Sequence, residues 1–209
     1  MQIVFALYEG FTPLDAVGPH EVLSRLPGVT TVFAAAERGP VRSDGTLTVS
    51  ADAALDELDR CDVLVVPGGP GTREVVLGDQ RYVDWVRRVH RTTRWTTSVC
   101  SGSLILGAAG LLDGLPATTH WGARKQLEAT GATYVPERVV TAGKIVTAAG
   151  VSAGIDMALT LAARIGGDVA AQAIQLWIEY DPRPPFDSGS LPKACPEVLD
   201  FVTAHLATG

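Results

Sequence analysis

Short runs of apolar residues recur along the chain, and they have the length of buried strands rather than of helices. The run at residues 2–8 ends at Glu9 and at Gly10, which favours a turn. Further strand-like runs lie at residues 29–35, 47–51, 61–66, 95–99, 133–135, 138–140 and 144–147. The run at residues 61–66 begins with Cys61, which we expect in the core.

Segments with helical spacing of apolar residues separate these strands. Between residues 14 and 26, Leu14, Val17, Val22 and Leu26 follow this spacing, and we expect Pro19 near the start of the helix. Further helices are predicted at residues 82–90, 102–112, 122–130, 149–165, 169–179 and 196–206. The alternation predicts an α/β fold, in which a mostly parallel sheet is covered by helices on both faces. Because there is no internal repeat or long linker, we expect a single domain over residues 1–209.

Composition narrows the functional classes. Hydrophobic residues make up 46% of the chain and charged residues 19%, which is typical of a globular protein with a sizeable core. The formal net charge of -6 argues against a nucleic-acid partner, and we expect the basic residues at 87–94 on a solvated helix face. No uninterrupted apolar run reaches the roughly 18 residues of a membrane span, so no membrane partner is expected.

The three cysteines, at positions 61, 100 and 195, form neither a paired framework nor a metal-binding spacing. We therefore expect no metal, and a reducing compartment such as the cytoplasm. The chain opens on the strand-like QIVFALY, without the pattern of a secretion signal, which is consistent with that localisation.

The strongest chemical candidate is Cys100, at the bend between the strand at 95–99 and the helix at 102–112. Backbone amides and the helix dipole favour an anion there, so we expect a thiol pKa below the ordinary value of about 8.5. The spacing resembles the G-x-S-x-G elbow of hydrolases, with Ser101 after the nucleophile, but Ser98 replaces the first glycine. The alternative interpretation is a buried structural thiol.

Two further features follow strands at the same edge of the predicted sheet. Asp15 follows the first strand and is either a catalytic carboxylate or a helix cap. The turn PGGPG at residues 67–71 lets backbone amides approach a ligand, or simply connects a strand tightly to a helix. No Gly-Lys-Ser/Thr follows this turn, which excludes a P-loop.

These segments together resemble the DJ-1/PfpI superfamily over nearly the whole chain. More narrowly, five segments are similar to those of isocyanide (isonitrile) hydratases: LDAVGPHEVL, SVCSGSLILGAAGLL, ATTHW, AGVSAGIDMALTLAA and IEYDPRPPFDSGS. The sensor halves of some AraC-type regulators carry similar Cys-x-Gly and TTHW segments.

The resemblance implies a flavodoxin-like three-layer sandwich, a homodimer and a reactive cysteine at a strained elbow. That cysteine maps to Cys100 and its carboxylate partner to Asp15. Hydratases often have threonine after the cysteine, and Ser101 keeps a hydroxyl there. By the same carry-over, Gly69 and Gly71 supply amides beside the thiolate.

Three more residues complete the candidate site. His120 lies in the segment where other branches place a histidine near the cysteine, and it is a secondary candidate. Trp121 and Phe186 are candidate walls for an apolar substituent; Phe186 lies in the proline-rich segment at residues 181–192, which we expect to be extended. The protease branch has histidine directly after its cysteine, so protease activity is not expected here.

For a hydratase, the resemblance implies a hydro-lyase reaction on a small isocyanide without a cofactor. The Cys100 thiolate attacks the isocyanide carbon while protonated Asp15 supplies the proton, and water converts the resulting thioimidate into an N-substituted formamide. A raised pKa of Asp15 suits a carboxyl group that acts first as acid and then as base.

Two alternatives remain open at this stage. Cys100 can belong to a non-catalytic sensor that binds a ligand or registers oxidation. The AraC-like regulators continue into a basic helix-turn-helix domain, which we do not find in this chain, so no DNA-binding role is expected. The second alternative is a glyoxalase-like or deglycase-like activity on 2-oxoaldehydes, against which Asp15 counts, because glutamate is usual there.

Overall fold

A seven-stranded sheet forms the centre of the first of two compact units in the chain, Met1–Ile178, in this computed structural model. The structure describes residues 1–205. In spatial order the strands are β10 (Val139–Ala142), β11 (Ile145–Ala148), β7 (Trp95–Val99), β6 (Val63–Val66), β1 (Gln2–Ala6), β2 (Thr30–Ala35) and β5 (Ala53–Ala54). Neighbouring strands are parallel except β10, which runs antiparallel to β11.

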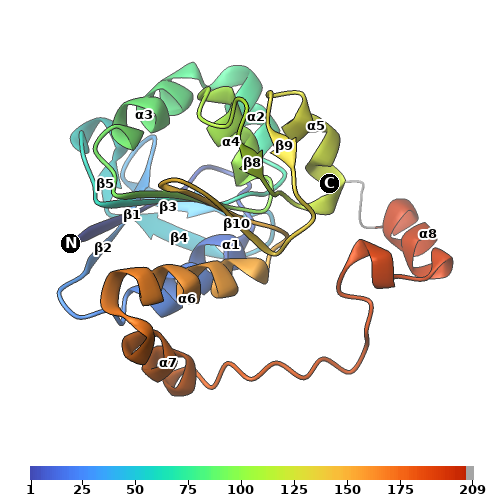
Figure 1. The fold of residues 1–209 in the computed structure, drawn as a ribbon. Coiled ribbons are helices and arrows are strands. Elements are labelled where there is room, and N and C mark those ends of the chain that lie inside the picture. The colour runs from blue at the N-terminus through green and yellow to red at the C-terminus, as the bar shows by residue number, and fades with distance from the viewer. Residues whose placement is uncertain (206–209) are drawn as a thin grey trace. The chain divides into compact units, whose positions relative to one another are not determined.

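Helices cover both faces of this sheet, as Figure 1 shows. One face carries α2 (Thr72–Gly78), α3 (Gln80–His90) and α4 (Gly102–Ala108), and the other carries α1 (Pro13–Leu23), α6 (Ala153–Gly166) and α7 (Asp168–Trp177). Smaller elements are the β-pairs β3 (Gly39–Arg42) with β4 (Thr48–Ala51) and β8 (Pro116–Ala117) with β9 (Thr133–Tyr134), the short helix α5 (Arg124–Glu128), and the 3-10 turns η1 (Leu55–Glu57) and η2 (Trp121–Ala123). The three-layer α/β sandwich is thus confirmed.

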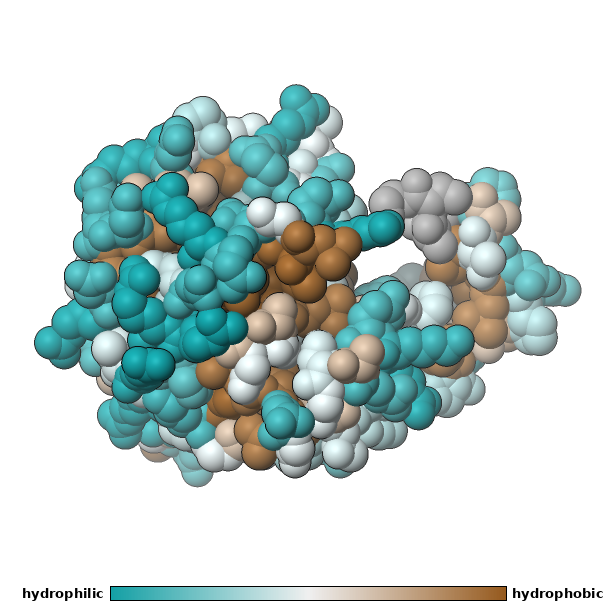
Figure 2. Space-filling model, turned by 90° about the horizontal axis from the view of Figure 1, so that it is seen from above, coloured by the Kyte–Doolittle hydropathy of each residue, from teal (hydrophilic) through white to brown (hydrophobic). Residues whose placement is uncertain are grey.

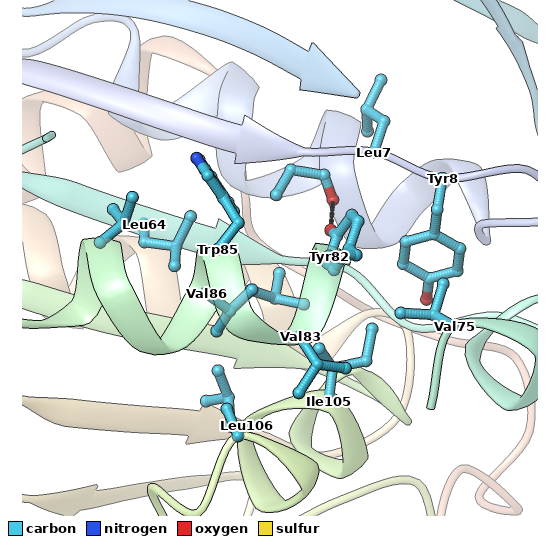
Figure 3. Close-up of a cluster of buried hydrophobic side chains, with 14 of the residues drawn as sticks. Leu7, Tyr8, Leu64, Val75, Tyr82, Val83, Trp85, Val86, Ile105 and Leu106 are labelled. Carbon is cyan, nitrogen blue, oxygen red and sulfur yellow. Dashed lines mark hydrogen bonds between the residues drawn. The ribbon is translucent and has the colours of Figure 1, made fainter. Parts of the chain in front are cut away.

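Side-chain alternation along the central strand divides the core between the two helical layers. Ile3 and Phe5 of β1 pack in the cluster with α1, α6 and α7, whereas Val4 and Ala6 pack in the cluster with α2, α3 and α4. Figure 3 shows part of the second cluster, where Tyr82 of α3 donates a hydrogen bond to the backbone oxygen of Ala6 (2.6 Å). Seen from the side of α2, α3 and α4, much of the surface is hydrophilic, and apolar residues are exposed between the hydrophilic ones (Figure 2).

Local structure differs from the sequence-based expectation in a few places. Pro19 lies inside α1 rather than near its start. Proline cannot donate the helical hydrogen bond there, but Gly154 of α6 makes room for its ring: a Cβ on Gly154 would lie 3.1 Å from Pro19 Cγ. The helix expected to reach residue 112 ends at Ala108, because Gly110 adopts a left-handed φ of 73°. The short α2 was not predicted.

The second unit, Glu179–Gly209, contains η3 (Leu191–Lys193) and α8 (Pro196–His205). Its described residues are exposed or half-buried, and large apolar side chains such as Phe186 and Phe201 are among the exposed ones. Within the segment at residues 181–192, which its prolines predicted to be extended, residues 181–190 have no regular secondary structure, whereas Leu191 and Pro192 belong to η3. The last residue of the helix predicted at 196–206 lies outside the described residues. That the whole chain is one domain stays a prediction.

Candidate active site

Cys100 occupies the bend between β7 and α4, as predicted. Its φ of 56° is left-handed, a conformation that costs a non-glycine residue on the order of 1–3 kcal/mol. Hydrogen bonds on both sides of the residue hold it there: its amide donates to the oxygen of Ala149 (2.8 Å) and its oxygen accepts from the Thr119 hydroxyl (3.0 Å). The fold therefore fixes one strained residue at the carboxyl edge of the sheet, where ligands bind in open α/β folds.

The glycine-rich turn after β6 lies directly against this elbow. A Cβ on Gly68 would stand 2.5 Å from the backbone nitrogen of Ser101 and 2.9 Å from Cys100 Cβ, so no side chain fits. The elbow also needs Gly102, where a Cβ would lie 2.3 Å from the backbone oxygen of Val66. Close approach of these backbones explains the glycines better than ligand binding by the turn does.

Asp15, in the first turn of α1, is fully buried beside the elbow. Its Oδ2 accepts a hydrogen bond from the backbone amide of Gly68 (2.9 Å), while Oδ1 has no hydrogen-bond partner among the described residues. Burial raises the pKa of Asp15 from 3.8 to about 7; the hydrogen bond from Gly68 and the interaction with the Cys100 side chain act in the opposite direction. This carboxyl group can therefore change its protonation state near neutral pH.

The thiol of Cys100 does not have the lowered pKa that its place before a helix suggested. Burial, followed by the charge of Asp15, raises its pKa to about 12. The amides of Ser101 and Val151 and the side chain of Ser101 favour the thiolate and so lower the pKa, but they do not offset burial. The expectation failed because it counted the helix terminus and not the 7% exposure of the residue.

Together, Asp15 and Cys100 form a buried acid pair that titrates jointly. With Asp15 ionised and Cys100 protonated, the pair holds one proton and one negative charge. Moving the proton from sulfur to the carboxyl group keeps that charge inside the site and creates a nucleophilic thiolate beside a proton donor. The arrangement can thus supply a nucleophile and an acid from one shared proton.

The other predicted residues next to the elbow are held mainly by contacts to one another. The amide of Gly69 donates to Ser101 Oγ (3.0 Å), which also lies 2.9 Å from the hydroxyl of Thr72. The amide of Gly71 donates to the oxygen of Gly10 (3.1 Å). These contacts make both glycine amides part of the scaffold of the turn, with Ser101 as the link to Cys100.

His120 and Trp121 lie together on the segment after β8, with ring centroids 5.2 Å apart. His120 Nδ1 accepts from the amide of Gly122 (3.2 Å), and burial lowers the pKa of His120 below its ordinary value. A Cβ on Gly150 would lie 3.0 Å from the His120 ring, which places the ring on the loop that carries the Val151 amide. Trp121 is 41% exposed, and Phe186, in the second unit, is 79% exposed.

Comparison with known proteins shows which family the chain belongs to. Residues 1–164 match the DJ-1/PfpI family. The chain belongs to the DJ-1/PfpI family. It is 42% identical to the isonitrile hydratase of Pseudomonas putida, over 96% of this chain and 87% of that protein. It is 33% identical to the HTH-type transcriptional regulator CdhR of Pseudomonas aeruginosa, over 78% of this chain and 50% of the regulator.

A solved structure of a ThiJ/PfpI family protein from Pseudomonas syringae has the same fold. It superposes with a TM-score of 0.92 and 38% identity, and the match covers 97% of this chain and 86% of that one. Among the residues described for this DJ-1/PfpI protein, no cluster of three or more His, Cys, Asp or Glu side chains is placed to hold a metal ion. In the same part of the chain, every helix is too short or too polar to cross a membrane.

Four residues of this DJ-1/PfpI site were missed by sequence reasoning. Gly68 anchors Asp15, the amide of Val151 acts on the thiol, and Thr72 and Tyr8 continue the hydrogen bonds of Ser101. Gly68 lies in the turn that the sequence did single out. The other three contacts join distant segments, so no local pattern in the sequence marks them.

Proposed function

We propose that this DJ-1/PfpI protein is an isonitrile hydratase, which adds water to an isocyanide and releases an N-substituted formamide. The observation that carries the proposal is the buried carboxyl group of Asp15 beside Cys100, with a pKa of about 7. The 42% identity to the isonitrile hydratase of Pseudomonas putida supports the same reaction.

In the first step the proton of the Asp15–Cys100 pair passes to the isocyanide carbon through the carboxyl group. The thiolate of Cys100 then forms a bond to that carbon, and the triple bond between carbon and nitrogen becomes a double bond. The product is a thioimidate, R–N=CH–S–Cys100. Delivery of the proton matters because the isocyanide carbon carries a lone pair and becomes strongly electrophilic when that lone pair is protonated.

In the second step water adds to the thioimidate carbon. Asp15, now a carboxylate, takes one proton from the water and passes it to the nitrogen. Loss of the second proton forms the carbonyl group as the carbon–sulfur bond breaks, and this proton returns to the Asp15–Cys100 pair. One water molecule is consumed, the product is R–NH–CHO, and the enzyme regains its resting charge.

The remaining site residues receive roles that follow from their positions. Ser101 links the elbow to the glycine-rich turn, and Val151 provides an amide that stabilises negative charge on sulfur. His120 lies against the loop at Gly150, and Trp121 lies beside His120; both are proposed to contact the substituent R, whereas a contact of R with Phe186 stays a prediction. The unpartnered Oδ1 of Asp15 is available to the isocyanide carbon or to water.

We also propose that two copies of the chain pair in solution. Leu14 and Val17 on α1 remain 40% and 39% exposed although they flank the buried Asp15, and a second copy would cover them. Light scattering after size exclusion is expected to give twice the chain mass of 21.9 kDa. A monomer that turns over isocyanide at full rate would remove the dimer from the account.

The reaction is tested by incubating the purified protein with an alkyl and an aryl isocyanide and following formamide by chromatography. Turnover by the wild type and none by Cys100→Ala is the expected result. If neither isocyanide is converted but methylglyoxal is consumed in a Cys100-dependent manner, the chain acts on 2-oxoaldehydes and the hydratase proposal fails.

A further inference from the structure

Three hydroxyl groups stand in a row behind the elbow and end at a backbone carbonyl. Ser101 Oγ lies 2.9 Å from Thr72 Oγ1, which lies 2.8 Å from Tyr8 Oη, and Tyr8 Oη donates to the oxygen of Pro67 at 2.8 Å. Tyr8 and Thr72 are 7% and 3% exposed, so water does not compete freely for these bonds. Figure 3 shows Tyr8 among the apolar side chains of the core cluster under α2, α3 and α4, near Val75 of α2.

Counting hydrogens fixes the direction of the row. A carbonyl oxygen only accepts, so Tyr8 must give its single hydroxyl hydrogen to Pro67. The bond between Tyr8 and Thr72 then requires Thr72 as donor, and the bond between Thr72 and Ser101 requires Ser101 as donor. Burial raises the pKa of Tyr8 well above 10, so the phenol keeps this hydrogen over the working pH range.

This order leaves Ser101 with acceptor capacity and no hydrogen for the sulfur of Cys100. One lone pair of Ser101 Oγ accepts from the amide of Gly69 (3.0 Å), and its hydrogen goes to Thr72, with the backbone oxygen of Gly69 as a second, longer acceptor (3.3 Å). We propose that Tyr8 and Thr72 are positioning residues that turn the hydroxyl hydrogen of Ser101 away from Cys100, so that Ser101 presents only an acceptor to the resting thiol. A donor hydrogen reaches the sulfur only when the row reverses.

Reversal has a defined cost. If Tyr8 donates to Thr72, Thr72 to Ser101 and Ser101 to the sulfur, Pro67 loses the one donor that the described residues provide for its oxygen. A neutral thiol, which is a weak acceptor, does not offset that loss, whereas a thiolate gains a charge-assisted hydrogen bond. The row therefore opposes the transfer of the shared proton from Cys100 to Asp15, which keeps the resting nucleophile protonated.

The inference rests on the proposed function only in taking Cys100 as the reactive group, and it is tested without isocyanide. Three charged groups affect the pKa values of this cluster: Asp44, Asp15 and Cys100. All three are retained in the variants below.

The experiment measures the rate at which iodoacetamide alkylates Cys100, by mass spectrometry of its peptide, from pH 6 to pH 9. Below the thiol pKa this rate is proportional to the thiolate fraction. Tyr8→Phe removes the donor to Pro67 and frees Thr72 to donate to Ser101, so we expect alkylation about tenfold faster than in the wild type, equivalent to a thiol pKa about one unit lower. Thr72→Val removes the acceptor of the Ser101 hydrogen and should act in the same direction.

Tyr82→Phe is the matched control. Tyr82 is also buried, lies against Tyr8 with ring centroids 5.8 Å apart, and also donates to a backbone oxygen, that of Ala6, but it is outside the row. It should leave the alkylation rate at the wild-type value. In a Ser101→Ala background, Tyr8→Phe should have no effect, because the hydrogen that it redirects is gone.

Circular dichroism shows whether each variant folds. The double variant Tyr8→Phe with Ser101→Ala distinguishes a change in the hydrogen bonds of Ser101 from a wider exposure of Cys100 at the elbow. If Tyr8→Phe alkylates more slowly than the wild type or at the same rate, the proposed order is wrong. Acceleration that persists in the Ser101→Ala background overturns the proposal as well, because it reports wider exposure of Cys100. Should Tyr8→Phe not fold, the same comparisons with Thr72→Val decide.

Discussion

Replacing Asp15 by asparagine should stabilise the fold while abolishing turnover. Asp15 is fully buried, and burial raises its pKa from 3.8 to about 7. Because each pKa unit corresponds to about 1.4 kcal/mol, keeping this carboxyl group ionised in the folded protein costs about 4 kcal/mol at pH 8. Asparagine retains an oxygen for the Gly68 amide and carries no charge, so it avoids this cost.

The net gain is smaller, because the new NH2 group takes the place of Oδ1, which has no partner among the described residues. An unpaired buried donor costs about 1–3 kcal/mol, which leaves Asp15→Asn more stable than the wild type by about 1–3 kcal/mol at pH 8. The sign depends on pH. Between pH 3.8 and about 7 the folded wild type binds more protons than the unfolded chain, so its stability falls as pH rises through that window. At pH 4 the advantage of the variant should therefore disappear or reverse.

Urea unfolding of both proteins at pH 4 and pH 8 measures the difference, and the isocyanide assay measures turnover. The amide side chain of the Asp15→Asn variant cannot carry the shared proton, so formamide production should fall to the background of the Cys100→Ala protein. A variant that is less stable than the wild type at pH 8, or whose stability relative to the wild type is the same at both pH values, would show that burial of the Asp15 charge does not destabilise the fold. A variant that still turns over isocyanide would remove Asp15 from the mechanism.

Three further predictions concern the elbow and its proton. Gly68→Ala should lower the free energy of unfolding by about 1–3 kcal/mol and reduce turnover, because its Cβ would meet the Ser101 nitrogen at 2.5 Å. Gly78→Ala is the control: nothing lies within 4 Å of a Cβ there, so this variant should unfold at the same urea concentration as the wild type. The value of kcat/KM should stay level above pH 7 and fall about tenfold per pH unit below it, because a second proton then occupies Asp15 and no thiolate can form. A rise of kcat/KM toward acid pH would show instead that the active pair holds two protons. Cys100→Gly should raise the free energy of unfolding by about 1 kcal/mol, since glycine adopts the left-handed φ of 56° without strain. A melting temperature below that of the wild type would argue against strain at the elbow.

Much of the fold follows from local patterns. The strand at Trp95–Val99 was predicted with its observed bounds, because a short β-rich run followed by small helix-forming residues leaves few alternatives. Errors arose where tertiary contacts overrode local preference. Pro19 is accommodated inside α1 by the small Gly154 on α6, and no property of residues 14–26 by themselves predicts that neighbour.

The candidate site was predictable in its residues and not in its electrostatics. Cys100 and Asp15 come after strands whose carboxyl ends share one edge, so their proximity follows from the topology. The pKa of Cys100 depends on how completely the elbow is covered and on which amides and hydroxyls face it. One of those neighbours is Val151, about 50 residues away along the chain. Another is Tyr8, which belongs to the row of hydroxyl groups behind Ser101 and lies more than 90 residues away. Sequence spacing carries no information on contacts of that range.

The most direct test of the proposed mechanism is to look for the covalent intermediate on Cys100. The wild-type protein is mixed with excess alkyl isocyanide, quenched with acid within milliseconds to seconds, and analysed by intact-mass and peptide mass spectrometry. We expect a species heavier by the mass of the isocyanide, located on Cys100, that forms before formamide accumulates. We expect no such species on the Cys100→Ala protein. Formamide production by the Cys100→Ala protein, or an adduct confined to Cys61 or Cys195, would show that Cys100 is not the nucleophile.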